Sequence, residues 1–213
     1  MFDEEPTQSL ILLVDVKTDG EQTWPFVVAQ LEPLRERGWL TFMQDGVVHN
    51  RAVTVVGTGN TPFDLLTRNE TYRDTFFDAP LERMWEPLPD ALTSTDDINE
   101  ASLPTPSLPP IDSGQGMIGI SPTSSFSQEN SYYASVAYGK AVGRPWTGKV
   151  TDKQLKIIRG HVRGAHRRGL KVRYWNLPSW PVGVRNHVWK VLVREGVDVL
   201  NVDDLWGVGR VEW

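Results

Sequence analysis

The sequence predicts an α/β fold built on a parallel sheet, and three observations carry this prediction. Runs rich in Val, Ile and aromatic residues alternate with helical patterns, which is the rhythm of βα units. The first run is continuously apolar from Leu10 to Val14, which suits a strand covered on both faces. Polar residues follow most of the strands, and in a parallel α/β barrel these carboxyl ends converge on one rim.

The predicted elements follow from local patterns along the chain. Strands are expected at 10–16, 52–56, 75–78, 132–137, 171–175 and 197–202, and helices at 24–37, 62–68, 151–168 and 182–195. Thr151 and Gln154 have the spacing of a capping box, and Gly169 can end that helix in the left-handed conformation. Pro33 should shorten or kink the helix that it interrupts.

Residues 86–130 differ in composition from the rest of the chain. They are rich in Pro, Ser, Thr, Gly and Asp and have hardly any periodic apolar residues. Such a segment buries too little apolar surface to offset the entropy lost on ordering. We therefore predict one domain over residues 1–213, with 86–130 as a low-complexity, largely disordered insertion.

The composition narrows the classes of protein to which the chain belongs. A net charge of −5 argues against general electrostatic binding to nucleic acid. The sequence has no cysteine, so it has neither a disulfide framework nor a thiolate metal site. No apolar run approaches the ~20 residues of a transmembrane helix, and the start lacks the pattern of a signal peptide. We expect a soluble protein, with a cytoplasmic or mitochondria-associated location left open.

The polar residues at the predicted strand ends are the candidate functional residues. They comprise Asp15 and Lys17, the segment Gly57, Thr58, Gly59 and Asn60, then Asp78, Ser135, Arg173, Trp175 and Asn176, and Asn201, Asp203 and Asp204. Asp15 offers an oxygen ligand to a hard cation, and Lys17 can neutralise a phosphate oxygen, as phosphoryl chemistry requires. The alternative is a structural ion pair that closes the first strand.

Other candidates also have two interpretations. The Gly57–Asn60 segment resembles a phosphate-binding turn, but a tight turn with Asn60 in the left-handed conformation is favoured. Adjacent aspartates point to opposite faces, so at most one of Asp203 and Asp204 faces the rim while the other caps a turn. Trp175 could stack on a sugar ring or a lipid headgroup, or serve in packing.

Several motifs together resemble one known family. They are Val14–Gly20, Val55–Pro62, Phe77–Leu81, Ser131–Ser135, Ala165–Trp175 and Gly196–Leu205. This set is similar to the fungal altered-inheritance-of-mitochondria phosphodiesterases. These belong to the phospholipase-C-like phosphodiesterase superfamily, with glycerophosphodiester phosphodiesterases and sphingomyelinase D as relatives. The motifs cover nearly the whole chain outside the insertion.

The resemblance implies a TIM-type (β/α) barrel and a divalent cation, Mg²⁺ or Ca²⁺. It implies that Asp15 is a metal ligand, that Lys17 lies beside the phosphate, and that Trp175 and Asp203 lie in the active site. Asp15 matches the family's third strand, so the first two βα units, with their histidines and acidic pair, are expected to be missing from this chain. The residues at 176–178 also depart from sphingomyelinase D, which has an acidic residue there.

The sequence thus predicts a phosphoric diester hydrolase domain with a lipid-derived substrate, incomplete for catalysis. Lys17 and Asp203 are its expected catalytic residues, Trp175, Asn60 and Asp78 its substrate-binding residues, and Asp15 its metal ligand. One alternative is a non-catalytic scaffold or interaction protein. Another is a carbohydrate-active barrel that uses Asp15 with Asp78 or Asp203 as its carboxylate pair.

Overall fold

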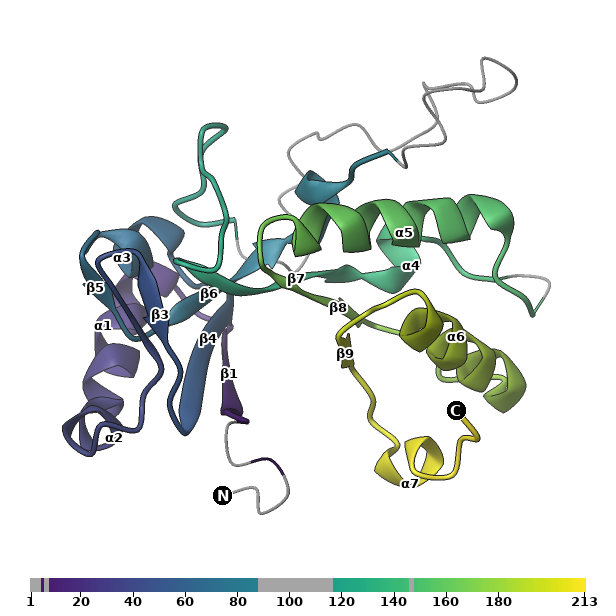
Figure 1. The fold of residues 1–213 in the computed structure, drawn as a ribbon, viewed down its shortest axis with the longest axis horizontal. Coiled ribbons are helices and arrows are strands. Elements are labelled where there is room, and N and C mark those ends of the chain that lie inside the picture. Colours follow the sequence, from purple (N-terminus) through teal and green to yellow (C-terminus); the bar gives the residue numbers. More distant parts are fainter. Residues whose placement is uncertain (1–4, 6–7, 88–116, 146–147) are drawn as a thin grey trace. The chain divides into compact units, whose positions relative to one another are not determined.

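The structure is a computed structural model that describes residues 5, 8–87, 117–145 and 148–213. The chain forms two compact units, both of which combine strands and helices (Figure 1). The first unit consists of residues 1–79 and 114–133, and the second of residues 80–113 and 134–213. The prediction of a mixed α/β fold with parallel strands is confirmed within each unit.

The first unit is built on three parallel strands in the order β1-β4-β6. These are β1 (Leu10–Val16), β4 (Val53–Gly59) and β6 (Phe76–Pro80). A small antiparallel sheet in the order β3-β2-β5 accompanies them, formed by β2 (Phe42–Gln44), β3 (Val47–His49) and β5 (Tyr72–Arg73). These three short strands are not among the six strands expected from the sequence.

Three helices belong to the first unit: α1 (Gly20–Gln30), α2 (Glu32–Glu36) and α3 (Phe63–Thr67). The single helix predicted over 24–37 is thus divided at Leu31, and Pro33 lies in the first turn of α2. Proline suits that position, where its missing N–H would have no helical partner. Leu31 belongs to a core cluster with Leu40, Val53 and Val55, so the division between the helices is anchored by packing.

Part of the predicted insertion packs against the first unit. Phe126 is buried, and its ring contacts the rings of Phe63 on α3 and Phe77 on β6. The amide of Phe63 donates to the carbonyl of Ile118, 2.9 Å away. Residues 88–116, the larger part of the predicted insertion, lie outside the described residues.

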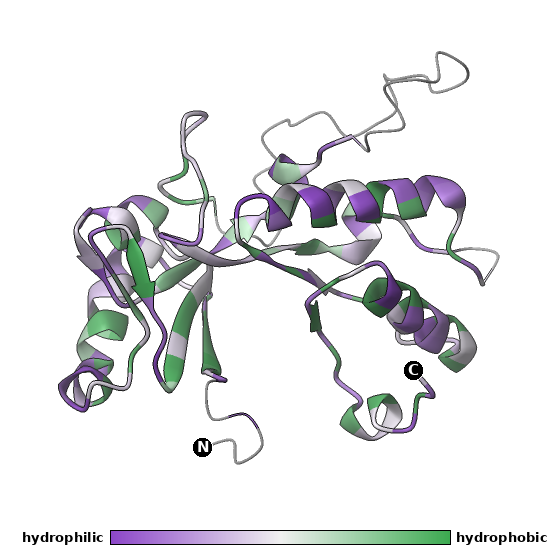
Figure 2. Cartoon of the chain, viewed as in Figure 1, coloured by the Kyte–Doolittle hydropathy of each residue, from purple (hydrophilic) through white to green (hydrophobic). Residues whose placement is uncertain are grey.

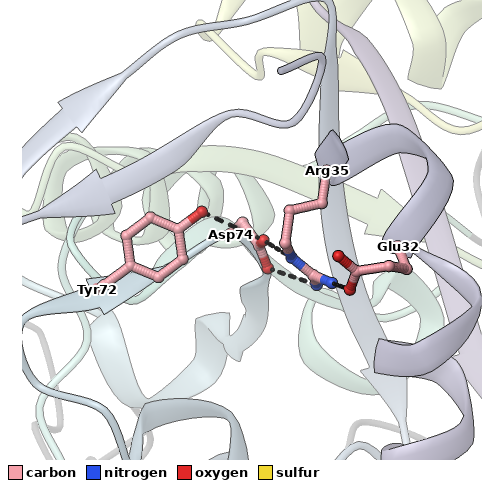
Figure 3. A network of polar contacts seen from close by, with 4 residues as sticks. All are labelled: Glu32, Arg35, Tyr72 and Asp74. Atoms are coloured by element: carbon pink, nitrogen blue, oxygen red, sulfur yellow. Dashed lines mark hydrogen bonds and ion pairs between the residues drawn. The ribbon is translucent and has the colours of Figure 1, made fainter. Parts of the chain in front are cut away.

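A polar network joins α2 to β5 in the first unit (Figure 3). The guanidinium of Arg35 donates to both carboxylate oxygens of Asp74 and pairs with Glu32, while the hydroxyl of Tyr72 donates to Asp74 over 3.4 Å. The hydrogen bond to the buried Asp74 raises the pKa of Arg35. A buried carboxylate without a partner would cost free energy of folding, so the bonds from Arg35 to Asp74 hold the end of β5 to α2.

The second unit contains strands β7 (Ser131–Ala137), β8 (Lys171–Trp175) and β9 (Val199–Leu200) in that order. Its helical segments are η1 (Leu81–Met84), α4 (Tyr138–Ala141), α5 (Asp152–His166), α6 (Val182–Arg194) and α7 (Leu205–Val208). The boundary between the two units falls within β7.

Helix α5 begins and ends as the sequence predicts. Thr151 and Gln154 form a capping box, and Gly169 has a φ of +71° just after the helix. One face of α5 is apolar and buried, whereas its hydrophilic face carries arginines (Figure 2). Arg159 pairs with Glu195, and Arg167 and Arg168 both pair with Glu86. Arg159, Arg163 and Arg167 are spaced by four residues, which indicates the solvated face of a helix.

Two glycines on α5 allow η1 and the residues after it to approach the helix closely. A Cβ atom at Gly164 would lie 1.5 Å from the carbonyl oxygen of Met84, and one at Gly160 would lie 2.2 Å from Nε1 of Trp85. The amide of Glu86 donates to the carbonyl of Gly160, 3.1 Å away. The packing of η1 on α5 therefore depends on the absence of a Cβ atom at Gly160 and at Gly164.

The second unit also buries a histidine. His161 on α5 is fully buried, with Nδ1 3.0 Å from the hydroxyl of Tyr174 on β8 and with Nε2 lacking a hydrogen-bond partner. Burial lowers the pKa of His161 from 6.5 to about 4. The imidazole is therefore neutral in the folded protein at physiological pH.

We expect this histidine to make the second unit sensitive to acid. Between pH 6.5 and 4 the unfolded chain binds a proton at His161 that the folded chain does not, so stability is complete above pH 6.5 and falls towards pH 4 by up to about 3 kcal/mol. Urea unfolding at several pH values checks this. His161→Gln should lose much of the acid sensitivity, while His49→Gln, on an exposed side chain, should keep it. Equal pH profiles for all three proteins would contradict the assignment.

Among the described residues, no helix is long and apolar enough to cross a membrane.

Candidate functional site

The first candidate pair lies at the carboxyl end of β1. Asp15 is the second-last residue of this strand, Lys17 follows the strand, and Lys17 Nζ lies 2.8 Å from Asp15 Oδ2. Both side chains are open to solvent, with exposed fractions of 76% for Lys17 and 44% for Asp15. An exposed ion pair contributes only ~0–1 kcal/mol to the stability of the fold. The pair is therefore of little importance for folding.

Neighbouring strands place further polar side chains level with Asp15. Asp15 is opposite Thr58 in the β1–β4 register, and Gly57 is opposite Phe77 in the β4–β6 register. Continuing by one residue sets Thr58 beside Asp78, and the hydroxyl of Thr58 donates to Asp78 Oδ2 over 2.9 Å. In a parallel sheet, residues in register share a face. Asp15, Thr58 and Asp78 therefore form one row across the three strands.

Asp78 differs from Asp15 in its surroundings. Asp78 is only 1% exposed, whereas the side chain of Asp15 is open to solvent. The hydrogen bond from Thr58 satisfies one oxygen of the buried Asp78 carboxylate. The row thus holds an accessible acid at its edge and a buried acid further in.

The end of β4 is shaped around Asp15. Gly59 has a φ of +65°, and a Cβ atom there would lie 2.4 Å from both Asp15 Oδ1 and the carbonyl oxygen of Val16. The amide of Asn60 donates to that Val16 carbonyl over 2.7 Å, and its side-chain nitrogen donates to the carbonyl of Thr18 over 2.9 Å. Asn60 therefore ties the β1–α1 loop to the end of β4.

The prediction that Asn60 adopts the left-handed conformation is wrong, because Gly59 takes it instead. Glycine pays no steric penalty there, and the missing Cβ leaves room for the Asp15 carboxylate. Asn60 is then free to use its side-chain amide as a donor to the neighbouring loop.

The other two predicted site residues belong to the second unit. Trp175 is the last residue of β8, and Asp203 is exposed between β9 and α7. Near them, Arg173 Nη2 donates to Asn201 Oδ1 over 2.5 Å, which connects the ends of β8 and β9. Asp204 caps α7 by accepting from the amide of Gly207, and this bond lowers the pKa of its carboxyl. As expected, one member of the aspartate pair serves as a cap.

The structure thus brings Asp15, Lys17, Asn60 and Asp78 to the carboxyl ends of adjacent strands in the first unit. Trp175 and Asp203 lie at strand ends of the second unit, and the roles of all six residues remain predictions. Thr58 belongs to the Gly57–Asn60 candidate segment, but of that segment only Asn60 was predicted to bind substrate, because the segment was interpreted as a tight turn. The alternation of side chains along β4 places Thr58 on one face of that strand, but its contact with Asp78 depends on the register between two strands.

A cavity of about 750 Å³ in the first unit lies apart from these residues. It is lined by side chains of α1, α3, β5 and the segments beside them, including Trp24, Leu66, Arg35, Tyr72 and Arg73. None of the predicted site residues lines it. The cavity adjoins the polar network of Figure 3, so it belongs to the helical side of the unit and not to the strand ends.

A hard divalent cation requires several oxygen ligands from the protein, water or substrate. Within the described ranges, no group of three or more His, Cys, Asp or Glu side chains is placed to hold a metal ion. Mg²⁺, however, usually keeps several waters and binds through one or two carboxylates plus substrate phosphates. An accessible carboxylate at a strand end, as Asp15 provides, fits that manner of binding.

Comparison with known proteins identifies the family. Residues 1–78 match the AIM6-like phosphodiesterase domain, and this range includes Asp15, Lys17, Asn60 and Asp78. The chain is 32% identical over 206 residues to an altered inheritance of mitochondria protein 6 homolog from Arthroderma benhamiae, covering 96% of the chain and 54% of that relative. The chain belongs to the family of altered inheritance of mitochondria protein 6.

Two further members of this family show how far the similarity extends. The Eremothecium gossypii protein is 30% identical over 214 residues, which cover 99% of the chain and 48% of the relative. The Saccharomyces cerevisiae protein is 26% identical over 220 residues, covering 97% and 48%. The chain therefore spans about half the length of the curated family members it matches. No solved structure matches the chain.

Proposed function

We propose that the chain contributes the cation- and phosphate-binding part of a phosphoric diester hydrolase whose substrate is a lipid-derived phosphodiester. The observation that carries this proposal is the solvent-open Asp15–Lys17 pair at the end of a parallel strand. It lies within the residues that match a phosphodiesterase domain. Active sites of parallel α/β barrels gather at carboxyl strand ends, which is where this pair stands.

The parallel strands of each unit follow one another in chain order, which supports a TIM-type barrel as the parent fold. In such a fold the row formed by Asp15, Thr58 and Asp78 faces the barrel interior. Trp175 ends β8 and Asp203 follows β9, both in the second unit. Trp175 would then supply an aromatic face to the substrate headgroup, and Asp203 a carboxylate.

Each residue of the first unit has a distinct chemical task in this proposal. Asp15 offers an oxygen ligand to Mg²⁺ or Ca²⁺, and the cation, when bound, stabilises charge that develops on the phosphate. Lys17 neutralises a phosphate oxygen from its exposed position. Asn60 positions the β1–α1 loop, and Asp78, hydrogen-bonded to Thr58, completes the polar face beneath the substrate.

Proton transfer at a strand end is a step for which no histidine of the described residues is placed. Its four histidines are His49 on β3, His161 and His166 on α5, and His187 on α6. None of them ends a strand of the parallel sheet, and His161 is fully buried. A positioned general acid or base contributes roughly a hundred- to ten-thousand-fold to the rate. We therefore propose that this chain by itself binds diesters but hydrolyses them slowly.

Lys17 favours a phosphodiester over a sugar as the substrate. A carbohydrate-active site would use Asp15 with a second carboxylate, yet Asp78, the other acid in the row, is hydrogen-bonded to Thr58 and buried. A non-catalytic scaffold would bind no diester at this strand end. Substrate binding separates these alternatives.

The test is calorimetric titration of the chain with glycerophosphocholine in the presence of Mg²⁺ or Ca²⁺, followed by hydrolysis assays on glycerophosphodiesters, lysophospholipids and sphingomyelin. We expect Lys17→Met to weaken diester binding about tenfold, a typical value for loss of one charge-assisted contact. Lys156→Met, on the exposed face of α5, is the matched control and should bind as the wild type does. Absence of diester binding, or equal affinity in the Lys17 variant, would contradict the proposal.

A further inference from the structure

The second unit exposes an unusual group of large apolar side chains near its strand ends. Trp180 is 77% exposed, Trp206 76%, Leu205 75% and Val182 45%. We refer to these four residues as the tryptophan surface. Isolated exposed apolar residues are common, but a group with two nearly free indoles indicates an interaction site.

One ion pair brings the two halves of this surface together. Arg185 in the first turn of α6 pairs with Asp204, 2.6 Å away, and its guanidinium lies over the ring of Trp189. Asp204 in turn caps α7. Trp180 and Val182 lie within five residues of Arg185, and Leu205 and Trp206 directly follow Asp204. The start of α6 therefore lies beside the short α7, and the four exposed apolar residues flank this contact in sequence.

The surface has a polar component as well. The guanidinium of Arg210 lies over the ring of Trp206, 5.0 Å from its centre. An indole with its polar N–H, held beside a guanidinium, matches the interfacial layer of a phospholipid membrane. There, the ring meets the glycerol and upper acyl region, and the cation meets the phosphates.

The charge of the chain decides which kind of membrane fits. The net charge is −5, and the exposed Asp203 and Glu212 lie close in sequence to the surface. An anionic membrane would therefore repel the chain as a whole. Tryptophan side chains partition into membrane interfaces without any need for lipid charge.

We propose that the tryptophan surface docks the chain onto the interfacial layer of zwitterionic phospholipid membranes. The surface lies next to the strand ends that carry Trp175 and Asp203, so docking would bring this rim to the membrane that contains lipid substrates. The choice of phospholipid rests on the proposed function, but docking itself requires no catalysis.

Co-sedimentation with phosphatidylcholine vesicles tests the proposal. The wild-type chain should sediment with the vesicles, and addition of phosphatidylserine should not strengthen binding. Trp180→Ala combined with Trp206→Ala should weaken partitioning by at least about tenfold, because each buried indole removes a large apolar area from water. Trp206→Ala alone, at a site with little packing to lose, provides a second variant with a smaller decrease.

Trp39→Ala is the matched control, because Trp39 is 45% exposed in the first unit and also lies beneath an arginine, Arg37. This variant should bind vesicles as the wild type does. Failure of the wild-type chain to sediment, equal binding by the double variant, or binding that needs phosphatidylserine would overturn the proposal.

Sedimentation velocity without lipid shows whether the surface instead joins two copies of the chain. If the wild type is a dimer and the double variant is a monomer, the docking proposal is wrong. Since these readouts involve neither Asp15 nor Lys17, their failure leaves the diester-binding proposal intact, and failure of diester binding leaves docking intact.

Discussion

Gly164→Ala is expected to destabilise the second unit by about 3 kcal/mol or more. In most helices this change would stabilise by up to ~1 kcal/mol, because alanine is the better helix former. Here the new Cβ would lie 1.5 Å from the carbonyl oxygen of Met84 and 2.6 Å from its carbon. Both atoms belong to the backbone, so η1 must move away from α5, and the fully buried Leu81 and Met84 would lose their packing. The steric cost of the new Cβ atom therefore exceeds the gain in helix propensity.

Gly183→Ala on α6 is the control for this prediction. No atom lies within 4 Å of a Cβ built at Gly183, so only the helix propensity changes. Urea unfolding of the two variants and the wild type should show a much lower midpoint for Gly164→Ala and an unchanged or slightly higher one for Gly183→Ala. Equal midpoints for Gly164→Ala and the wild type would show that η1 does not pack on α5 as described.

Strong local signals allowed much of the fold to be predicted. The strands at 10–16 and 171–175 were predicted with the bounds that the structure has, because each is a compact apolar or aromatic run followed by a turn. Helix α5 was predicted from its capping box and its closing glycine, which are purely local features. Such signals do not depend on the rest of the chain.

The elements that the sequence did not reveal depend on tertiary contacts. β2, β3 and β5 are two or three residues long, too short for a periodic pattern. β2 and β3 form a local hairpin, whereas β5 pairs with β2 through Met43 with Arg73 and Gln44 with Tyr72, which are far apart in the sequence. The division between α1 and α2 at Leu31 likewise depends on the core that this residue joins. Phe126, within a segment of low apolar content, is buried only because Phe63 and Phe77 provide an aromatic partner surface.

The candidate site shows the same limit. The strand-end position of Asp15 and Lys17 could be predicted from the alternation of side chains along one strand. The contact between Thr58 and Asp78 could not, because it depends on the register of two strands separated by an intervening helix. The left-handed conformation fell on Gly59 and not on Asn60, since the Asp15 carboxylate occupies the space where a side chain would lie.

The second large effect is expected at Asp15. Asp15→Asn keeps the size of the side chain and its contact with Gly59 but removes the charge that attracts a cation. Hard divalent cations prefer charged oxygen ligands, so the affinity for Mg²⁺ should fall by about tenfold or more. Binding should weaken rather than vanish, because water and phosphate oxygens supply the remaining ligands.

Asp45→Asn is the matched control for this substitution. Asp45 is exposed in the same unit and has a φ of +51°, a conformation that asparagine tolerates well. It therefore loses the same charge without disturbing the fold.

The measurement that tests the central claim most directly is calorimetric titration of Mg²⁺ into the wild type, Asp15→Asn and Asp45→Asn, each with glycerophosphocholine present. A cation site at the end of β1 predicts a Mg²⁺ affinity that is about tenfold or more lower in Asp15→Asn alone. Equal Mg²⁺ affinities in all three proteins would remove Asp15 from the site and contradict the account.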